Sequence, residues 1–199
     1  VMGRANRALG RYASRIALSF ARTQKAEGFA DKSTVTGNPI RDNARAVAGA
    51  AYPELSATGP LDLVVFGGSQ GARIFADLVP PAIAELPEPL RRRLNIVQQC
   101  RPEDLERVAA AYRQAGVKAE LQPFFADLPA RMASAHLVVA RSGASTIAEL
   151  TAIGRPAILV PLPGSIDGDQ KNNAEVMAAA GGGWIVEQAN ISPPSLAKR

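Results

Sequence analysis

The sequence is poor in the residues that carry cysteine and histidine chemistry. Its 199 residues include one cysteine, Cys100, and one histidine, His136. A single cysteine excludes an internal disulfide framework, and because Cys100 lies in an apolar run we interpret it as a buried small side chain in a protein of a reducing compartment. His136 stands at the start of a predicted strand, where a structural role is the more common one. No Ser/His/Asp or Cys/His set can be assembled around it.

Long apolar runs and early acidic residues are also missing. No stretch approaches the roughly 18 to 20 apolar residues of a membrane span, and these residues contain no signal-peptide pattern, so we expect a soluble or peripheral protein. Before Glu27 there is no acid, whereas six bases occur: Arg4, Arg7, Arg11, Arg15, Arg22 and Lys25. Spacings of three and four predict an amphipathic helix over residues 3–15. Its basic face is either simply solvated or meets a phosphate-rich partner such as an anionic membrane surface.

We expect a piece of a longer chain. The sequence does not begin with Met, and Ser192 followed by Pro193 and Pro194 predicts the cap and first turn of a helix that is then cut off. With 47% hydrophobic and 21% charged residues, the chain can bury a core but is small for two complete domains. One domain plus part of another is the expected organisation.

From Leu61 onward, short apolar runs alternate with helical patterns. The runs cover residues 61–66, 95–100, 119–124, 136–140, 156–160 and 183–187, and the helices roughly 72–85, 103–115, 127–134, 144–153 and 170–180. This alternation predicts an α/β fold with a Rossmann-like parallel sheet and helices on both faces. Upstream, short strands are predicted within 16–20 and 33–41, followed by a connecting segment over 42–60. In such sheets ligands bind beyond the carboxyl ends of the strands.

The first loop at such a strand end is Gly67-Gly68-Ser69-Gln70-Gly71. Glycines let the backbone approach a ligand closely, and the amino terminus of the following helix offers unpaired N–H groups to an anion such as a diphosphate. The spacing is neither G-x-G-x-x-G nor a Walker motif, so it supports neither dinucleotide nor P-loop ATP binding. A purely structural tight turn is the alternative.

The second loop, residues 141–146, follows the run 136–140 and opens a helix with Glu149 one turn inside. A carboxylate there can accept a pair of hydrogen bonds from vicinal hydroxyls, as in ribose recognition. Alternatively, Ser142 or Ser145 caps the helix and Glu149 is solvated.

The third loop, residues 161–176, is long and rich in Pro and Gly. It gathers the amides of Gln170, Asn172 and Asn173 at the start of the next helix, where they would suit sugar hydroxyls; an ordinary polar helix start is the alternative. Asp167 and Asp169 lack a third ligand at suitable spacing, so no metal site is expected.

Four motifs, in this order and at these separations, resemble the carboxyl-terminal half of a GT-B glycosyltransferase of the MurG family. They are "GNPIR" (37–41), "GGSQGAR" (67–73), "RSGASTIAEL" (141–150) and "DQKNNA" (169–174). Residues 1–20 are similar to the end of that family's amino-terminal domain. The resemblance implies two Rossmann-like domains: residues 1–40 would be the end of the amino-terminal, acceptor-side domain with the junction, and residues 41–199 the truncated UDP-sugar-binding domain.

The activity that the resemblance implies is inverting transfer of N-acetylglucosamine from UDP-N-acetylglucosamine to the undecaprenyl-pyrophosphoryl-muramoyl-pentapeptide lipid (lipid I to lipid II). This is a step of bacterial peptidoglycan synthesis at the cytoplasmic face of the plasma membrane, with no cofactor, metal or nucleic acid implied. The general base is expected in the amino-terminal domain, so this chain alone would not turn over. Alternatives are another UDP-sugar-dependent GT-B enzyme, such as a glycolipid glycosyltransferase or an epimerase, or a non-catalytic nucleotide-sugar-binding module.

The resemblance also assigns residues to parts of the sugar donor. It places the diphosphate at Arg41 and Ser69, the ribose at Glu149 and the sugar hydroxyls at Gln170 and Asn173, with the backbone of Phe125 at the uracil edge. The full set implied to bind UDP-N-acetylglucosamine is Arg41, Ser69, Gln70, Phe125, Ala144, Ser145, Thr146, Glu149, Gln170 and Asn173. The sequence departs from the family at Ala126, where an acid is common, and at Asp169, where a His often precedes the Gln.

Overall fold

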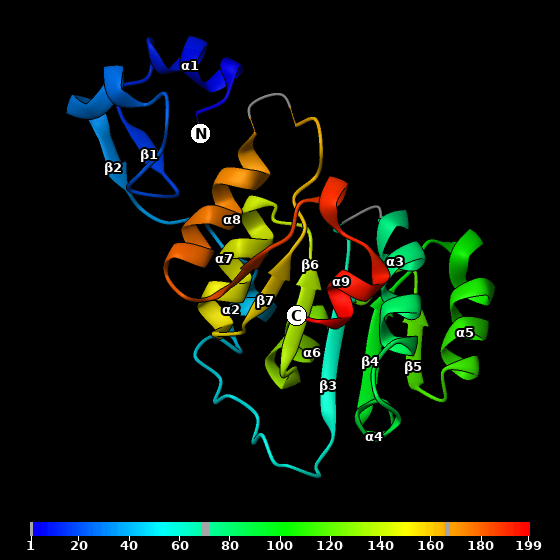
Figure 1. Cartoon of the computed structure of the whole chain (residues 1–199). Helices are drawn as coiled ribbons and strands as arrows, with labels where there is room; N and C mark the ends of the chain where they lie inside the picture. Colours follow the sequence, from blue (N-terminus) through cyan, green and yellow to red (C-terminus); the bar gives the residue numbers. More distant parts are fainter. Residues whose placement is uncertain (1, 69–71, 166–167) are drawn as a thin grey trace.

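The computed structural model of the chain describes residues 2–68, 72–165 and 168–199, whose strands form two sheets (Figure 1). The larger sheet has the order β5-β4-β3-β6-β7-β8, and every neighbouring pair is parallel. Its strands are β3 (Leu61–Phe66), β4 (Leu94–Gln99), β5 (Lys118–Gln122), β6 (Leu137–Ala140), β7 (Ala157–Leu159) and β8 (Gly183–Ile185). In this doubly wound order the direction of winding reverses between β3 and β6, which opens a crevice at their carboxyl ends. The predicted α/β fold is confirmed.

Helices cover both faces of this sheet because successive strand side chains point to opposite sides. Leu63 and Val65 of β3 join the core under α3 (Arg73–Ala84), α5 (Leu105–Gln114) and α9 (Pro193–Ala197). Val64 and Phe66 join the core under α6 (Leu128–Ser134), α7 (Ala144–Ile153) and α8 (Asp169–Ala179). The short helices α2 (Asp42–Arg45) and α4 (Glu88–Arg91), together with the 3-10 turns η2 (Pro102–Asp104) and η3 (Gln188–Asn190), complete this part. Cys100 is buried in the first core, as the sequence predicted.

Helix α3 stays regular although it contains Pro80 and Pro81. Pro80 has no N–H to donate to the carbonyl of Ala76, four residues earlier. Arg107 on α5 supplies a substitute, since its Nη1 lies 3.4 Å from that carbonyl oxygen. The amino terminus of α3 is therefore held at the carboxyl end of β3.

The smaller sheet pairs β1 (Ile16–Leu18) with β2 (Ser33–Val35) in parallel, next to α1 (Arg4–Gly10) and the 3-10 turn η1 (Glu27–Lys32). The expected helix over residues 3–15 is wrong in length, because it ends at Gly10. A Cβ at Gly10 would lie 3.0 Å from Cε of Met2 and 3.2 Å from the ring of Phe29, so the chain is packed closely there. Beyond it, Lys32 Nζ donates to the carbonyl of Ala13 at 2.9 Å, which draws these residues toward η1 instead of into another helical turn.

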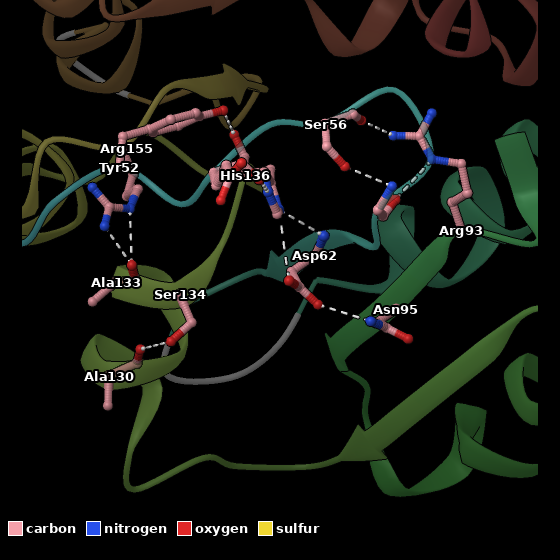
Figure 2. A network of polar contacts seen from close by, with 12 residues as sticks. Tyr52, Ser56, Asp62, Arg93, Asn95, Ala130, Ala133, Ser134, His136 and Arg155 are labelled. Carbon is pink, nitrogen blue, oxygen red and sulfur yellow. Dashed lines mark hydrogen bonds and ion pairs between the residues drawn. The ribbon is translucent and has the colours of Figure 1, made fainter.

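The connecting segment predicted over residues 42–60 begins with helix α2, and only residues 46–60, which keep this name below, lack a regular helix or strand. They run along the amino edge of the large sheet and are bonded to it (Figure 2). Buried Arg155 donates Nη1 to the carbonyl of Ala50 at 3.1 Å and Nη2 to that of Ala51 at 2.7 Å. The hydroxyl of Tyr52 donates to the carbonyl of His136 at 2.8 Å. His136 accepts the N–H of Asp62 through Nδ1 at 3.0 Å, so its role is structural, as predicted.

Candidate functional site

A cavity of about 530 Å³ opens at the carboxyl edge of the large sheet, beside the ends of β3, β4, β5 and β6. It brings together six of the ten residues predicted to bind a ligand: Arg41, Phe125, Ala144, Ser145, Thr146 and Glu149. The remaining wall is made by Pro39, Phe66, Gly68, Gln99, Phe124, Leu128 and Gly143. We call this cavity the edge pocket. Its position is the crevice where a doubly wound sheet binds ligands.

Arg41 and Glu149 form a bidentate ion pair in this pocket. Nε donates to Oε1 at 2.7 Å and Nη2 donates to Oε2 at 2.8 Å. The Arg41 side chain is 54% exposed, whereas that of Glu149 is 4% exposed. The hydrogen bond that Arg41 donates to Glu149 outweighs partial burial and raises the pKa of Arg41 above its ordinary value. The alternative of a solvated Glu149 is therefore wrong.

The amino terminus of α7 faces the edge pocket without a side-chain cap. Gly143 is the N-cap residue and no side chain caps the helix, so the alternative that Ser142 or Ser145 caps it is wrong. Ser142 is fully buried and donates its hydroxyl to the carbonyl of Gln170 at 2.8 Å. The first N–H groups of α7, at Ala144, Ser145 and Thr146, have no helical acceptor and lie in the pocket wall. This arrangement suits an anion or a ligand with acceptor oxygens.

Phe125 is held rigidly at the pocket wall. Its ring is 5% exposed, and the guanidinium of Arg131 lies 4.6 Å from the ring centre. Arg131 is itself fixed by Glu120 and Asp127, and these hydrogen bonds raise its pKa above the ordinary value. Phe124, the neighbouring residue, is 62% exposed in the same wall, and sequence reasoning missed it.

Gln99 is a second pocket residue that the sequence did not single out. Its Oε1 accepts the N–H of Gly67 at 3.1 Å, and its Nε2 donates to the carbonyl of Pro123 at 3.0 Å. One buried amide thus ties the loop after β3 to the loop after β5. The available signal was a pair of amides, Gln98 and Gln99, near the carboxyl end of the strand run "NIVQQC".

The glycine-rich loop after β3 is described only at its start. Gly68 has φ of 92°, in a region that L side chains rarely adopt, so glycine is required there for the backbone alone. Ser69, predicted to contact the diphosphate, and Gln70, predicted to bind the sugar donor, lie outside the described residues.

Gln170 and Asn173 lie outside the edge pocket. Gln170 Oε1 accepts the N–H of Leu162 at 3.0 Å, and Asn173 Nδ2 donates to the carbonyl of Ser142 at 3.1 Å. Asn173 lines a second cavity of about 470 Å³, which we call the cleft, between the small sheet and the start of α7 and α8. Ala144 lines both spaces, so the edge pocket and the cleft adjoin.

Neither a metal centre nor a membrane helix is found in the described part of the chain. Within residues 2–68, 72–165 and 168–199, no three His, Cys, Asp or Glu side chains gather as metal ligands. Asp169 lines the cleft, and Asp167 is outside the described residues. None of the helices described is long and apolar enough to cross a bilayer.

A doubly wound sheet with a pocket at its switch point defines a nucleotide-binding type of α/β domain. More specifically, the chain belongs to the glycosyltransferase family 28 C-terminal domain family, whose model matches residues 62–199.

Similar proteins extend the match over the whole chain. The chain is 57% identical over 199 residues to the UDP-N-acetylglucosamine--N-acetylmuramyl-(pentapeptide) pyrophosphoryl-undecaprenol N-acetylglucosamine transferase of Methylobacterium sp. (strain 4-46), covering 99% of this chain and 54% of that protein. It is 52% identical over 200 residues to the protein of the same name from Paramagnetospirillum magneticum (strain ATCC 700264 / AMB-1), and the match covers 100% of this chain and 54% of that protein. The crystal structure of Acinetobacter baumannii MurG superposes with a TM-score of 0.81 at 29% identity, covering 100% of this chain and 54% of that one. The chain thus spans about half the length of these relatives.

Proposed function

We propose that the chain is the sugar-donor-binding part of an enzyme that transfers N-acetylglucosamine from UDP-N-acetylglucosamine to the undecaprenyl-pyrophosphoryl-muramoyl-pentapeptide lipid. The observation that carries the proposal is the edge pocket itself. It gathers Arg41, Phe125, Glu149 and the uncapped start of α7 at the switch point of the sheet. The 57% identity to a transferase of that name supports the choice of substrates.

In this proposal the sugar donor lies across the edge pocket with its sugar toward the cleft. The uracil edge meets the backbone of Phe125, and the ribose hydroxyls donate to the carboxylate of Glu149. The diphosphate lies near Arg41 and the loop that contains Ser69 and Gln70. N-acetylglucosamine then extends past Ala144 into the cleft, where Asn173 lies in the wall and Gln170 stands one turn away on α8.

The proposed reaction is an inverting displacement at the anomeric carbon. The 4-hydroxyl of the acceptor forms the new bond to that carbon, the bond to the β-phosphate oxygen breaks, and UDP leaves with the electron pair. Negative charge grows on the diphosphate in the transition state, where Arg41 and the N–H groups at the helix amino termini stabilise it. The hydroxyl proton goes to a base that we place in the amino-terminal half of the relatives. Residues 1–40 would belong to that acceptor side and residues 41–199 to the donor side.

The same proposal places the protein peripherally on the cytoplasmic face of the membrane that carries the lipid. On and just after α1, Leu9 is 66% exposed and Tyr12 is 89% exposed, beside the exposed bases Arg4, Arg11 and Arg15. Apolar tips among bases suit the interface of an anionic bilayer. In co-sedimentation, the chain should bind vesicles that contain phosphatidylglycerol and not vesicles of phosphatidylcholine alone. Leu9→Ser/Tyr12→Ser should weaken this binding, and Leu55→Ser, at an exposed leucine of the connecting segment, serves as the control.

Two measurements test the transferase proposal. NMR titration of this chain should show UDP-N-acetylglucosamine binding that shifts signals around the edge pocket. For turnover, the chain is joined to the amino-terminal half of the Methylobacterium relative and assayed with the lipid acceptor and radiolabelled donor. Transfer to the lipid supports the proposal. Donor binding without transfer in a correctly folded chimera would favour a non-catalytic module, and absence of binding would refute the donor site.

A further inference from the structure

Arg141, the first residue after β6, is a buried arginine whose partners are all neutral. Its side chain reaches across the carboxyl edge of the sheet, and the residue is 9% exposed. Nη1 donates to the carbonyls of Val160 and Pro161, each at 3.0 Å, and Nη2 donates to Oε1 of Gln188 at 2.6 Å. One side chain therefore holds both the loop after β7 and the turn η3.

No carboxylate among the described residues pairs with this guanidinium. By contrast, Arg41, Arg107 and Arg131 each form an ion pair with a carboxylate. Burying a charge without a counter-charge is costly, so such a group is usually paired. Burial accordingly lowers the pKa of Arg141 from its ordinary value. The fold retains a positive charge that nothing in the described protein neutralises.

The register of the sheet places the backbone of Arg141 level with the start of the glycine-rich loop. Ala140 pairs with Phe66 on β3, so Arg141 is level with Gly67, where the loop begins. The guanidinium also lies 5.6 Å from the ring centre of Phe75, a fully buried residue in the first turn of α3. The charge thus adjoins the helix whose amino terminus follows that loop.

We propose that Arg141 is a positioning residue for the diphosphate of the sugar donor: it fixes the loop after β7 beside the first turn of α3, and its charge, which no described carboxylate neutralises, favours an anion at the amino terminus of α3. The inference rests on the proposed function, because it requires a diphosphate in the edge pocket. It adds a residue that the resemblance did not assign. Arg141 acts through the loops and the local potential without contacting the reacting atoms.

A purely structural role is the competing explanation, and the chain contains a matched control for it. Arg155 is also buried, at 2% exposure, and its hydrogen bonds likewise go to neutral groups, in its case the backbone carbonyls of residues such as Ala50, Ala51 and Ala133. It lies at the amino edge of the sheet, opposite the edge pocket (Figure 2). Replacing either arginine removes several buried hydrogen bonds, but only Arg141 stands near the proposed anion.

The experiment compares uridine, UMP and UDP by NMR titration of the wild-type chain, Arg141→Met, Arg141→Lys and Arg155→Lys, with thermal unfolding recorded for each. If Arg141 positions the diphosphate, Arg141→Met should weaken UDP binding by about tenfold or more and leave uridine binding within about twofold. Arg141→Lys keeps a charge without the planar fork, so we expect a smaller loss for UDP, about threefold, and none for uridine. Arg155→Lys should lower the melting temperature and leave both affinities unchanged.

The alternative outcomes separate the inference from the proposed function. Equal losses of uridine and UDP binding in the Arg141 variants, or the same pattern in Arg155→Lys, would show a structural role and overturn the inference alone. Should Arg141→Met fail to fold, Arg141→Lys decides, since UDP binding in that variant equal to that of the wild type also overturns it. A wild-type chain that binds no UDP would refute both the donor site and the inference.

Discussion

Arg41 and Glu149 are 108 positions apart in the sequence, and each oxygen of the Glu149 carboxylate accepts one hydrogen bond from the Arg41 guanidinium. The resemblance had given these residues separate tasks, one at the diphosphate and one at the ribose. In the structure they satisfy each other. If the donor binds as proposed, we expect the partners to be exchanged: ribose hydroxyls replace Arg41 on Glu149, and the released guanidinium meets the diphosphate. Arg41 is half exposed but Glu149 is buried, so the pair can open only as the ribose hydroxyls take the place of Arg41 on the carboxylate.

Glu149→Gln should weaken UDP binding by about tenfold, because the amide offers one acceptor oxygen where the ribose needs two. Glu106→Gln, on the exposed face of α5, is the control and should bind UDP as the wild type does. Binding is measured by NMR titration on both variants. Unchanged affinity in Glu149→Gln would remove the ribose assignment, and an equal loss in the control would point to net charge as the cause.

Arg155→Met should release the connecting segment. The substitution removes the hydrogen bonds to the carbonyls of Ala50 and Ala51, and we expect a loss of about 2–3 kcal/mol in the free energy of unfolding. Hydrogen exchange should accelerate over residues 46–60 and stay slow in β3 and β6. Arg113→Met, at an exposed position on α5, controls for the loss of a charge. Slow exchange throughout the segment would mean that Tyr52 and His136 suffice to hold it.

Gly183→Ala should destabilise the edge of the large sheet. A Cβ at Gly183 would lie 2.3 Å from the carbonyl oxygen of Ala157 on the neighbouring strand, which backbone cannot easily relieve. Crowding of this kind costs about 1–3 kcal/mol, measurable by urea unfolding. At Gly28 no atom lies within 4 Å of the added Cβ, so Gly28→Ala should change stability by less than about 0.5 kcal/mol. Equal stability of the two variants would contradict the packing of β8 on β7.

Cys100 should resist alkylation in the native protein. Burial, together with the nearby charge of Asp104, raises the pKa of its thiol to about 11. At pH 8 only about 0.1% of the thiol is then ionised, and the thiolate is the reactive form. Iodoacetamide labelling followed by mass spectrometry should show little native reaction and complete reaction in urea. Because the unfolded thiol ionises first, stability should fall as the pH rises from 9.0 toward about 11. Rapid native labelling would show that the site opens.

Features that local sequence determines were predicted correctly, whereas features that depend on tertiary contacts were not. The helix predicted over residues 144–153 has those bounds in the structure, because apolar periodicity and the Gly154 C-cap both mark it. The helix predicted over 3–15 was too long, because the end of the observed helix depends on a tertiary contact, the packing of Gly10 against Phe29. Spacing located Glu149 but gave no sign that Arg41 would reach it. Gln99 was missed because its two hydrogen bonds join loops that become neighbours only when the strands pair.

The anchoring of Arg41 also limits how far the small sheet can move from the large one. The N–H of Thr36 donates to the carbonyl of Leu18 at 3.0 Å and Arg41 donates to Glu149 at 2.7 Å, so residues 37–40 form the covalent bridge, while Phe20 also packs against the core of the large sheet. Four residues extend to about 14 Å at most, and Pro39 fixes one of their φ angles. A linker this short keeps the two walls of the cleft close together, so the effective concentration of one wall at the other is very high. Any rotation about this bridge that reshaped the cleft would also have to move Phe20 against that core.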